Sequence, residues 1–259
     1  MKRILMSVAI CLICLLFVSA GRAEDPLTPE QRAWIKGHGT IRVGVLSYYP
    51  PFAFVDETGE PRGMSIDFWR LLSSRLEFWI QFYPTSFNQQ LKGLKSGQFD
   101  SLGGIFSLTE RRKFFDFTKA YTIIRTNIYV KPKHSHLKSL NDLKELKLSV
   151  VEGDSGQAIA RKAGLDPSSY TNYREAVFDL ADGGTDAIIM DEQVVVYFVA
   201  EYDLQDKITK TSRPVDEGEV TLPVRKGDFT LLEILNKGID MVSKDEWKEI
   251  EKEWLGRGY

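Results

Sequence analysis

The chain has 259 residues, enough for one large or two small domains, and carries 34 Lys and Arg against 36 Asp and Glu, a formal net charge of -2 at pH 7. This mildly acidic, evenly mixed composition lacks the basic surface expected of a nucleic-acid-binding protein. We therefore expect the partner to be a small molecule or another protein.

The first residues have the pattern of a secretory signal peptide. Two basic residues precede an apolar run from Ile4 to Val18, and small residues lead to an expected cleavage at Ala23, which takes the net charge from -2 to -5. The run is too short to favour a spanning helix, although a retained N-terminal anchor is the alternative. Both cysteines, Cys11 and Cys14, lie in this run. The mature protein is therefore expected in the periplasm, soluble and without a disulfide.

The mature sequence begins with an alternating pattern that predicts a strand at 41–45, ending before the double proline at 50–51. Residues 52–64 predict a hairpin that turns around Gly59. A helix follows, with Ser65 or Asp67 as its N-cap and an inward stripe within 68–76. We then expect a strand at 79–83, a helix at 87–96 and a short strand at 99–103. Four tryptophans are assigned to packing: Trp69, Trp79, Trp247 and Trp254.

A second alternating series starts after a polar link at 132–139. It predicts a strand within 147–153, a helix at 155–162, a segment at 170–181, a buried strand at 186–190 and a helix from 192 to about 202. Extended passes and one long amphipathic C-terminal helix complete the chain. Two α/β series joined by extended crossings at about 122–129 and 213–224 predict two lobes, with the C-terminal helix returning to the first. A ligand is then expected in the cleft between the lobes, where strand ends meet.

Five motifs occur in the order, and at nearly the spacing, of a known family: IRVGVLSYYPPFAF, GMSIDFWRLL, FDSLGGIFSLTERRKFFDFTKAY, LSVVEGDSG and DAIIMDE. The mature chain resembles the bacterial extracellular solute-binding proteins of family 3, periplasmic proteins that mostly deliver polar amino acids to ABC importers. The resemblance implies a type II periplasmic-binding-protein fold. In that fold, residues 24–124 and 219–259 form lobe 1, residues 125–218 form lobe 2, and residues 1–23 form the signal peptide.

The resemblance leaves three functions open. The first is an amino-acid binder, expected to be a monomer, for an ABC permease. The second is a free-standing sensory binder of an amino acid or other carboxylate, because LTPEQRAWIKGHGTIRVGV resembles the start of periplasmic sensor domains and no cytoplasmic module follows Tyr259. The third is an enzyme similar to periplasmic cyclohexadienyl dehydratases, for which the residues give no direct support. Genomic neighbours and prephenate turnover separate these three.

The family binds the ligand carboxylate with an arginine, whose planar fork suits a carboxylate. The family's spacing from a phenylalanine after the arginine, counted back from Phe117, selects Arg111. The family's spacing from an earlier aspartate, counted forward from Asp100, selects Arg112. The two counts disagree because this chain has one residue fewer between Asp100 and Phe117 than the commoner family pattern. We favour Arg111 and expect the other arginine to be a solvated charge. Gly103 and Gly104 would let backbone amides approach the ligand.

Three other polar groups complete this candidate carboxylate site. Ser107 could add a hydroxyl near the arginine. EGDSG (152–156), with Asp154 and Ser155, follows a strand and opens a helix, where backbone N–H groups favour an anion. Ser155 matches the family's hydroxyl contact to the carboxylate. A tight turn without a ligand is the alternative interpretation of Gly103, Gly104 and Ser107. An ordinary helix cap is the alternative interpretation of EGDSG.

Asp191 ends a predicted strand at the position where the family places the acceptor of the ligand's α-ammonium group. A helix N-cap is the alternative. Phe87 matches an aromatic wall in the family, and Tyr49 and Phe52 flank the double proline, so these rings could sandwich a ligand side chain. For Phe52, core packing is an equal alternative.

The histidines offer little for a metal site. His134 and His136 form a short His-x-His, but only His38 could join them. No phosphate loop or nucleophile elbow is present. We therefore expect no metal, no cofactor and no nucleic-acid partner.

Overall fold

The computed structural model describes residues 25–211 and 213–256, so the predicted signal peptide lies outside the described residues. Among these residues, no helix is both long and apolar enough to cross a bilayer. The elements in chain order are α1 (Pro29–His38), β1 (Thr40–Leu46), β2 (Tyr48–Tyr49), β3 (Ala53–Val55), β4 (Pro61–Arg62), α2 (Met64–Leu76), β5 (Trp79–Thr85), α3 (Phe87–Ser96), β6 (Ser101–Leu102), β7 (Ile105–Phe106), η1 (Arg111–Lys113), β8 (Phe115–Val130), η2 (Pro132–His134), η3 (Leu140–Leu143), β9 (Leu148–Val151), α4 (Ser155–Lys162), β10 (Ser168–Tyr170), α5 (Tyr173–Asp182), β11 (Ala187–Asp191), α6 (Glu192–Glu201), β12 (Thr209–Lys210), β13 (Asp216–Arg225), α7 (Phe229–Asp240) and α8 (Lys244–Leu255).

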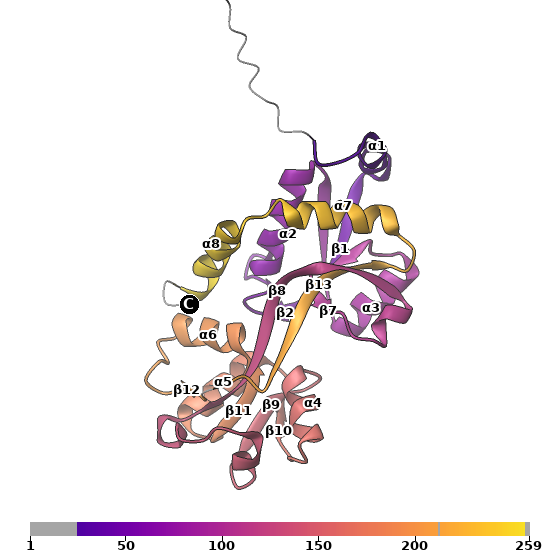
Figure 1. Cartoon of the computed structure of the whole chain (residues 1–259). Helices are drawn as coiled ribbons and strands as arrows, with labels where there is room; N and C mark the ends of the chain where they lie inside the picture. The colour runs from indigo at the N-terminus through magenta and orange to yellow at the C-terminus, as the bar shows by residue number, and fades with distance from the viewer. Residues whose placement is uncertain (1–24, 212, 257–259) are drawn as a thin grey trace, which may run out of the picture.

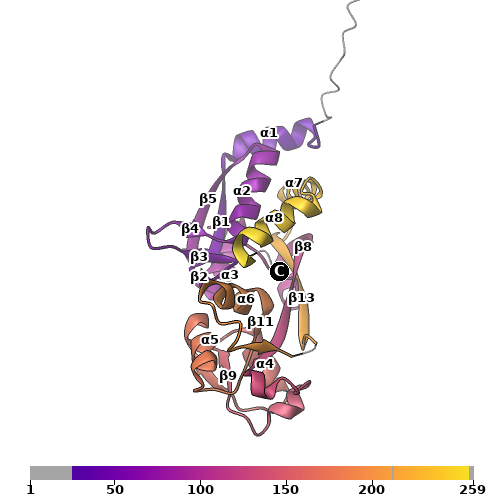
Figure 2. The same ribbon diagram turned by 90° about the vertical axis from the view of Figure 1, so that its left-hand side faces the viewer.

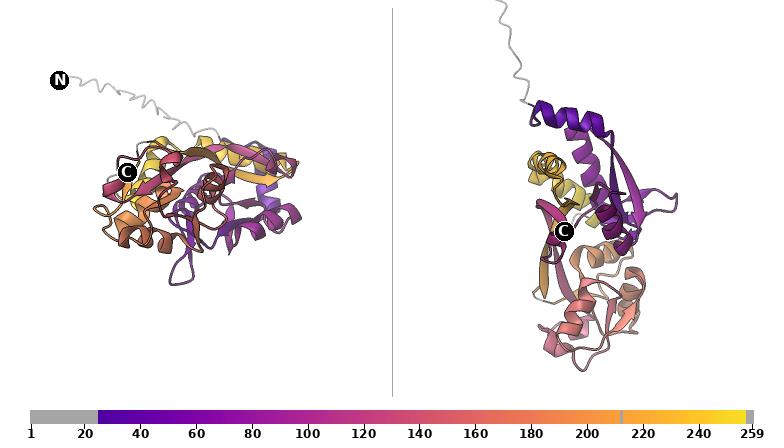
Figure 3. Two further views of the ribbon diagram at one scale, coloured as in Figure 1. Left: turned by 90° about the horizontal axis from the view of Figure 1, so that it is seen from below. Right: turned by 90° about the vertical axis from the view of Figure 1, so that its right-hand side faces the viewer.

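Two groups of elements are joined by the long antiparallel strands β8 and β13, which run side by side from one group to the other (Figure 1, Figure 3). We call α1 to η1 with α7 and α8 the first lobe, and β9 to β12 with α4 to α6 the second lobe. One sheet passes through both in the order β10-β9-β11-β8-β13-β6-β1-β5. The prediction of two α/β series joined by two extended crossings is confirmed.

The chain returns to the first lobe after β13, as expected, but as two helices rather than one. Leu231, Ile234 and Leu235 of α7 enter the core of the first lobe, and Figure 2 shows α7 and α8 beside α2. The chain breaks between them because Ser243 starts a new helix with a capping box. Its hydroxyl accepts from the Glu246 N–H at 3.2 Å, and the Glu246 carboxylate accepts from the Ser243 N–H at 2.9 Å.

The hairpin β3–β4 leads into α2 at a position that the sequence did not predict. The helix begins at Met64 with Gly63 as its N-cap, so the predicted caps Ser65 and Asp67 are wrong. Gly63 has φ +125°, and a Cβ there would lie 2.4 Å from the Phe52 carbonyl oxygen. Only glycine permits this tight passage from the hairpin into the helix.

The cores of the two lobes are apolar clusters on either side of the connecting strands. The first lobe packs α2 and α7 against β1, with Trp69 fully buried between them. The second lobe packs β9 and β11 against α4 and α5. Trp79 is 79% exposed at the start of the edge strand β5, so its assignment to packing is wrong. An edge strand has one neighbour fewer to cover its side chains, which its alternating pattern does not reveal.

Candidate functional site

The two lobes touch through a hydrogen bond between side chains that are 142 positions apart. Tyr49 belongs to β2 of the first lobe, and its hydroxyl donates to Oδ2 of Asp191 at 2.6 Å. Asp191 is the last residue of β11 in the second lobe and is 2% exposed. The strand end that the sequence singled out therefore meets the opposite lobe.

The carboxylate of Asp191 also receives two hydroxyl groups from its own lobe and the connecting strand. Thr126 is its direct partner across the β8–β11 ladder, and its Oγ1 donates to Oδ1 at 2.6 Å. The Ser155 hydroxyl donates to the same oxygen at 3.2 Å. Burial raises the pKa of Asp191, while the Thr126, Tyr49 and Ser155 hydrogen bonds oppose that rise.

Glycine at position 156 explains why Ser155 reaches Asp191. A Cβ at Gly156 would lie 2.2 Å from the Ile189 carbonyl oxygen. Its absence lets the first turn of α4 approach β11 closely. The strand-to-helix stretch EGDSG therefore places one hydroxyl at the end of the neighbouring strand.

Asp154 caps α4 and turns its second oxygen inward. Its Oδ1 accepts from the Ser155 N–H at 2.8 Å. Its Oδ2 is buried and has no hydrogen-bond partner among the described residues. Burial raises the pKa of Asp154 to about 7, and the charge of Asp191 adds to the rise. The start of α4 thus carries an acid beside its N–H groups.

Aromatic rings stand against these acids. Tyr49 stacks on Phe52 with ring centroids 5.0 Å apart and meets Tyr173, the first residue of α5, at 5.3 Å. Phe52 is only 3% exposed and belongs to the apolar cluster at the lobe interface. Burial and the two nearby acids hold the pKa of both tyrosines well above the ordinary value. Both phenols therefore stay neutral and keep their protons to donate.

The two adjacent arginines differ in burial. Arg111 is half-buried, with its guanidinium 5.0 Å from the centre of the Phe87 ring and one hydrogen bond, 2.9 Å long, to the Phe106 carbonyl oxygen. Arg112 is exposed and donates to the Ser107 hydroxyl at 2.9 Å. Burial lowers the pKa of Arg111. The charge of the neighbouring Glu110 opposes this shift, but no acid among the described residues forms an ion pair with this half-buried cation.

The predicted glycines and Phe87 lie around this arginine in different ways. Gly103 already donates its N–H to the Gly44 carbonyl oxygen at 2.8 Å, which leaves only Gly104 of the predicted amide pair. A Cβ at Gly104 would lie 2.4 Å from the Tyr121 hydroxyl, so glycine is required for packing. Phe87 begins α3 and supplies a half-buried face for Arg111.

Two residues of this site were missed by sequence reasoning. In the sequence, Thr126 is one residue of a predicted extended crossing, and Tyr173 is one residue of the segment at 170–181, for which no structure was assigned. Their contacts depend on the register of β8 against β11 and on where α5 begins. Neither feature carries a local sequence signal.

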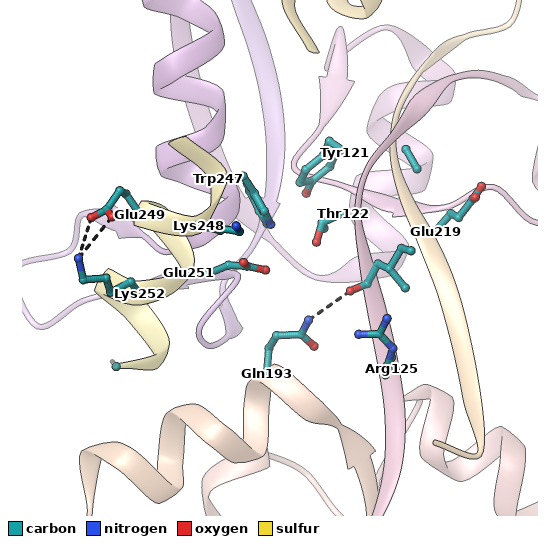
Figure 4. Close-up of a pocket in the computed structure, with 13 residues that line it drawn as sticks. Tyr121, Thr122, Arg125, Gln193, Glu219, Trp247, Lys248, Glu249, Glu251 and Lys252 are labelled. Atoms are coloured by element: carbon teal, nitrogen blue, oxygen red, sulfur yellow. Dashed lines mark hydrogen bonds and ion pairs between the residues drawn. The ribbon is translucent and has the colours of Figure 1, made fainter. Parts of the chain in front are cut away.

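A cavity of about 800 Å³ is lined by none of the predicted site residues (Figure 4). It lies between α8, the connecting strands and α6, and at its edge Tyr121 packs against Trp247 with ring centroids 5.6 Å apart. Gln193 donates to the Ile123 carbonyl oxygen at 3.2 Å. Lys252 pairs with Glu249 at 3.1 Å, whereas Glu251 forms no ion pair among the described residues and burial raises its pKa. This cavity therefore holds an unpaired acid of its own but no residue that the sequence predicted for the site.

Comparison with known proteins assigns the fold and family. The sequence profile of the bacterial extracellular solute-binding proteins, family 3, matches residues 41–257. This chain belongs to that family. Its two lobes and two connecting strands are the type II periplasmic-binding-protein fold, in agreement with the resemblance seen in the sequence.

Three relatives illustrate the range of the family. The L-cystine-binding protein TcyJ of Escherichia coli (strain K12) is 28% identical over 227 residues, which cover 86% of this chain and 85% of that protein. The solved structure of an ancestral cationic amino acid solute-binding protein has a TM-score of 0.76 and 27% identity, covering 86% of this chain and 99% of that one. A histidine kinase sensor domain with similarity to periplasmic binding proteins has a TM-score of 0.72 and 26% identity, covering 84% and 96%.

Proposed function

We propose that this protein is exported to the periplasm and captures an α-amino acid between its lobes for delivery to an ABC importer. The boundaries proposed for the lobes are 24–124 with 219–259, and 125–218. The observation that carries the proposal is the pair of opposite, unmatched charges at the site. Asp191 is a buried acid that already meets the other lobe, and Arg111 is a half-buried cation without an anionic partner among the described residues.

A zwitterionic ligand would pair with both charges at once. The ligand carboxylate pairs with the guanidinium of Arg111, which has several N–H donors beyond the one given to Phe106. The ligand ammonium pairs with Asp191, in place of the Tyr49 hydroxyl. Because both contacts are complete only when the lobes close on the ligand, binding stabilises the closed state.

A thermal-shift screen tests the proposal. The mature chain is mixed with each of the twenty amino acids and with small carboxylates that lack an amine, such as glutarate. We expect one group of amino acids to raise the melting temperature, because a ligand that binds only the folded state stabilises it. Stabilisation by carboxylates alone, or by no amino acid, contradicts the proposal.

Two further measurements check the expected form of the protein. Mass spectrometry of the exported protein checks cleavage after Ala23, and light scattering checks the expected monomer.

A sensory role is the second candidate, favoured by the similarity to a histidine kinase sensor domain. In that role the closed protein would signal to a membrane receptor instead of a permease. Deleting the gene separates the two. Loss of uptake of the bound amino acid supports the importer, whereas intact uptake with a lost transcriptional response supports the sensor.

We propose binding without catalysis. The relative and the ancestral protein compared above are named for the solutes that they bind. Turnover of prephenate by the purified protein would overturn this part of the proposal.

A further inference from the structure

Two carboxyl groups share the second-lobe side of the site, but only one of them is satisfied. Asp191 accepts three hydroxyl groups, from Tyr49, Thr126 and Ser155. Asp154 accepts one backbone N–H on Oδ1, while its buried Oδ2 has no partner among the described residues. A buried carboxylate oxygen without a donor is costly. It therefore marks a place where a donor is missing.

Neither acid has a cation to offset its charge. Among the described residues, no Lys, Arg or His forms an ion pair with Asp154 or Asp191. The pKa of Asp154 is raised to about 7, mainly by burial and secondly by the charge of Asp191. Asp191 is buried, and Asp154 is partly buried with its Oδ2 covered. Two such neighbouring carboxyls resist ionising together, so the pair holds most of one proton below pH 7 and loses it above.

The surroundings of the pair suit a cation better than an anion. Tyr49 from β2 donates its hydroxyl to Asp191, and Tyr173 from α5 packs on the Tyr49 ring. Both phenols are neutral and bring no positive charge to the acids. Thr126 from β8 and Ser155 from α4 contribute neutral hydroxyls, and Asp216 at the start of β13 adds a further negative charge at longer range. The N-terminus of α4 is capped by the acid Asp154. A second negative charge at this helix end would be repelled, so a ligand anion is disfavoured where the EGDSG stretch predicted one.

We propose that Asp154 and Asp191 together receive one cationic group of the ligand, and that this group replaces the proton that the pair holds in the free protein. The proposal rests on the function proposed above and adds Asp154 as a specificity-determining residue. The proton leaves to solvent as the cationic group enters, so the net charge of the site is unchanged. A carboxylate without an amine supplies no donor for Oδ2 of Asp154 and is rejected.

The free protein gives the first test. Carboxyl carbons of the aspartates are followed by NMR between pH 4 and pH 9, in the wild-type protein and in the Asp154→Asn variant. Asparagine is nearly isosteric and is as good an N-cap as aspartate, so α4 is retained. We expect one titration near pH 7 in the wild-type protein, absent from the variant. Titration of both Asp154 and Asp191 below pH 5 would overturn the proposal.

Calorimetry with two probes, L-arginine and L-glutamine, gives the second test. Titrations at pH 6 and pH 8.5, each in two buffers of different ionisation enthalpy, count the protons released on binding. For the probe that binds the wild-type protein, we expect release of close to one proton at pH 6 and almost none at pH 8.5. Between pH 6 and pH 7, the affinity should increase as the pH is raised, by up to about tenfold per pH unit, because the proton and the ligand compete for the same acid pair. Above about pH 7 the affinity should level off.

The Asp154→Asn variant and a matched control complete the design. The variant should bind the probe about tenfold more weakly at pH 8.5 and without proton release. Asp166→Asn, which changes an exposed aspartate of the same lobe, should behave as wild type. Wild-type affinity and proton release in Asp154→Asn sink the acid-pair proposal alone. Failure of the wild-type protein to bind any amino acid sinks the proposed function, and the NMR titration still decides on the acid pair.

Discussion

The candidate site residues of the two lobes satisfy their charges in different ways. On the first lobe, Arg111 rests on the Phe87 ring and gives one hydrogen bond to a backbone carbonyl, with N–H donors to spare. On the second lobe, Asp191 is saturated by hydroxyls, while Asp154 keeps a buried oxygen without a donor among the described residues. One side lacks an anion and the other lacks a donor. Under the function proposed above, one molecule carrying both charges would supply both missing partners.

The arginine side is where we expect the largest effect. Arg111→Ala should cost about 3 kcal/mol of binding free energy, roughly a hundredfold in affinity, because the ligand carboxylate then loses its charged partner. Arg112→Ala is the matched control and should change affinity by less than about threefold, since Arg112 is exposed. Calorimetry measures both. Equal losses in the two variants would remove the distinction between the arginines.

On the acid side, Asp191→Asn should cost about 2 kcal/mol of affinity for an amino acid, because a charge-assisted hydrogen bond to the ammonium becomes a neutral one. An amine-free analogue of the same amino acid should bind weakly to both the wild-type protein and the variant. The expected loss is smaller than for Arg111 because Asp154 still offers a carboxylate. An Asp191→Asn protein with undiminished affinity would place the ammonium elsewhere.

Asp154 should also leave a signature in stability. Its pKa of about 7 in the folded protein exceeds the ordinary value of 3.8. Its contribution to stability is therefore fully present below about pH 4 and is lost as pH rises through about 7. Asp154→Asn should then raise the melting temperature by a few degrees at pH 8.5, where about 1 kcal/mol corresponds to about 2 to 4 °C, and leave it unchanged at pH 4. A stability gain that is equal at both pH values would show that charge is not the cause.

Removing the hydrogen bond between Tyr49 and Asp191, which links the two lobes, should give the smallest change in ligand affinity. Tyr49→Phe keeps the ring but removes the hydroxyl that occupies Asp191. We expect the free variant to open, seen as a larger radius of gyration in X-ray scattering, and to bind an amino acid up to a few-fold more tightly. A tenfold loss of affinity would mean instead that the hydroxyl contacts the ligand.

Much of the fold was predictable from the sequence because its signals are local. The strand ending at Asp191, the helix beginning at Ser155 and the two extended crossings follow from apolar patterns and capping residues. The break between α7 and α8 was missed because the apolar stripe continues across it, although Ser243 and Glu246 form a capping box that could have revealed it.

The site was predictable only in part, because its contacts are made in three dimensions. The sequence offered Asp154 as part of an anion-binding turn, and only the close approach of α4 to β11 reveals it as the neighbour of a second acid. Thr126 and Tyr173 join the site through strand register and helix placement. The choice between Arg111 and Arg112 depends on a single 3-10 turn, which residue counting could not resolve.

The most direct measurement is a crystal structure of the complex with the amino acid that stabilises the protein most. Our account predicts the ligand carboxylate on the guanidinium of Arg111. It also predicts the ligand ammonium within about 3 Å of both Asp191 and Asp154, with the Tyr49 hydroxyl displaced. A ligand whose carboxylate lies at the start of α4, or whose ammonium avoids both acids, would contradict it.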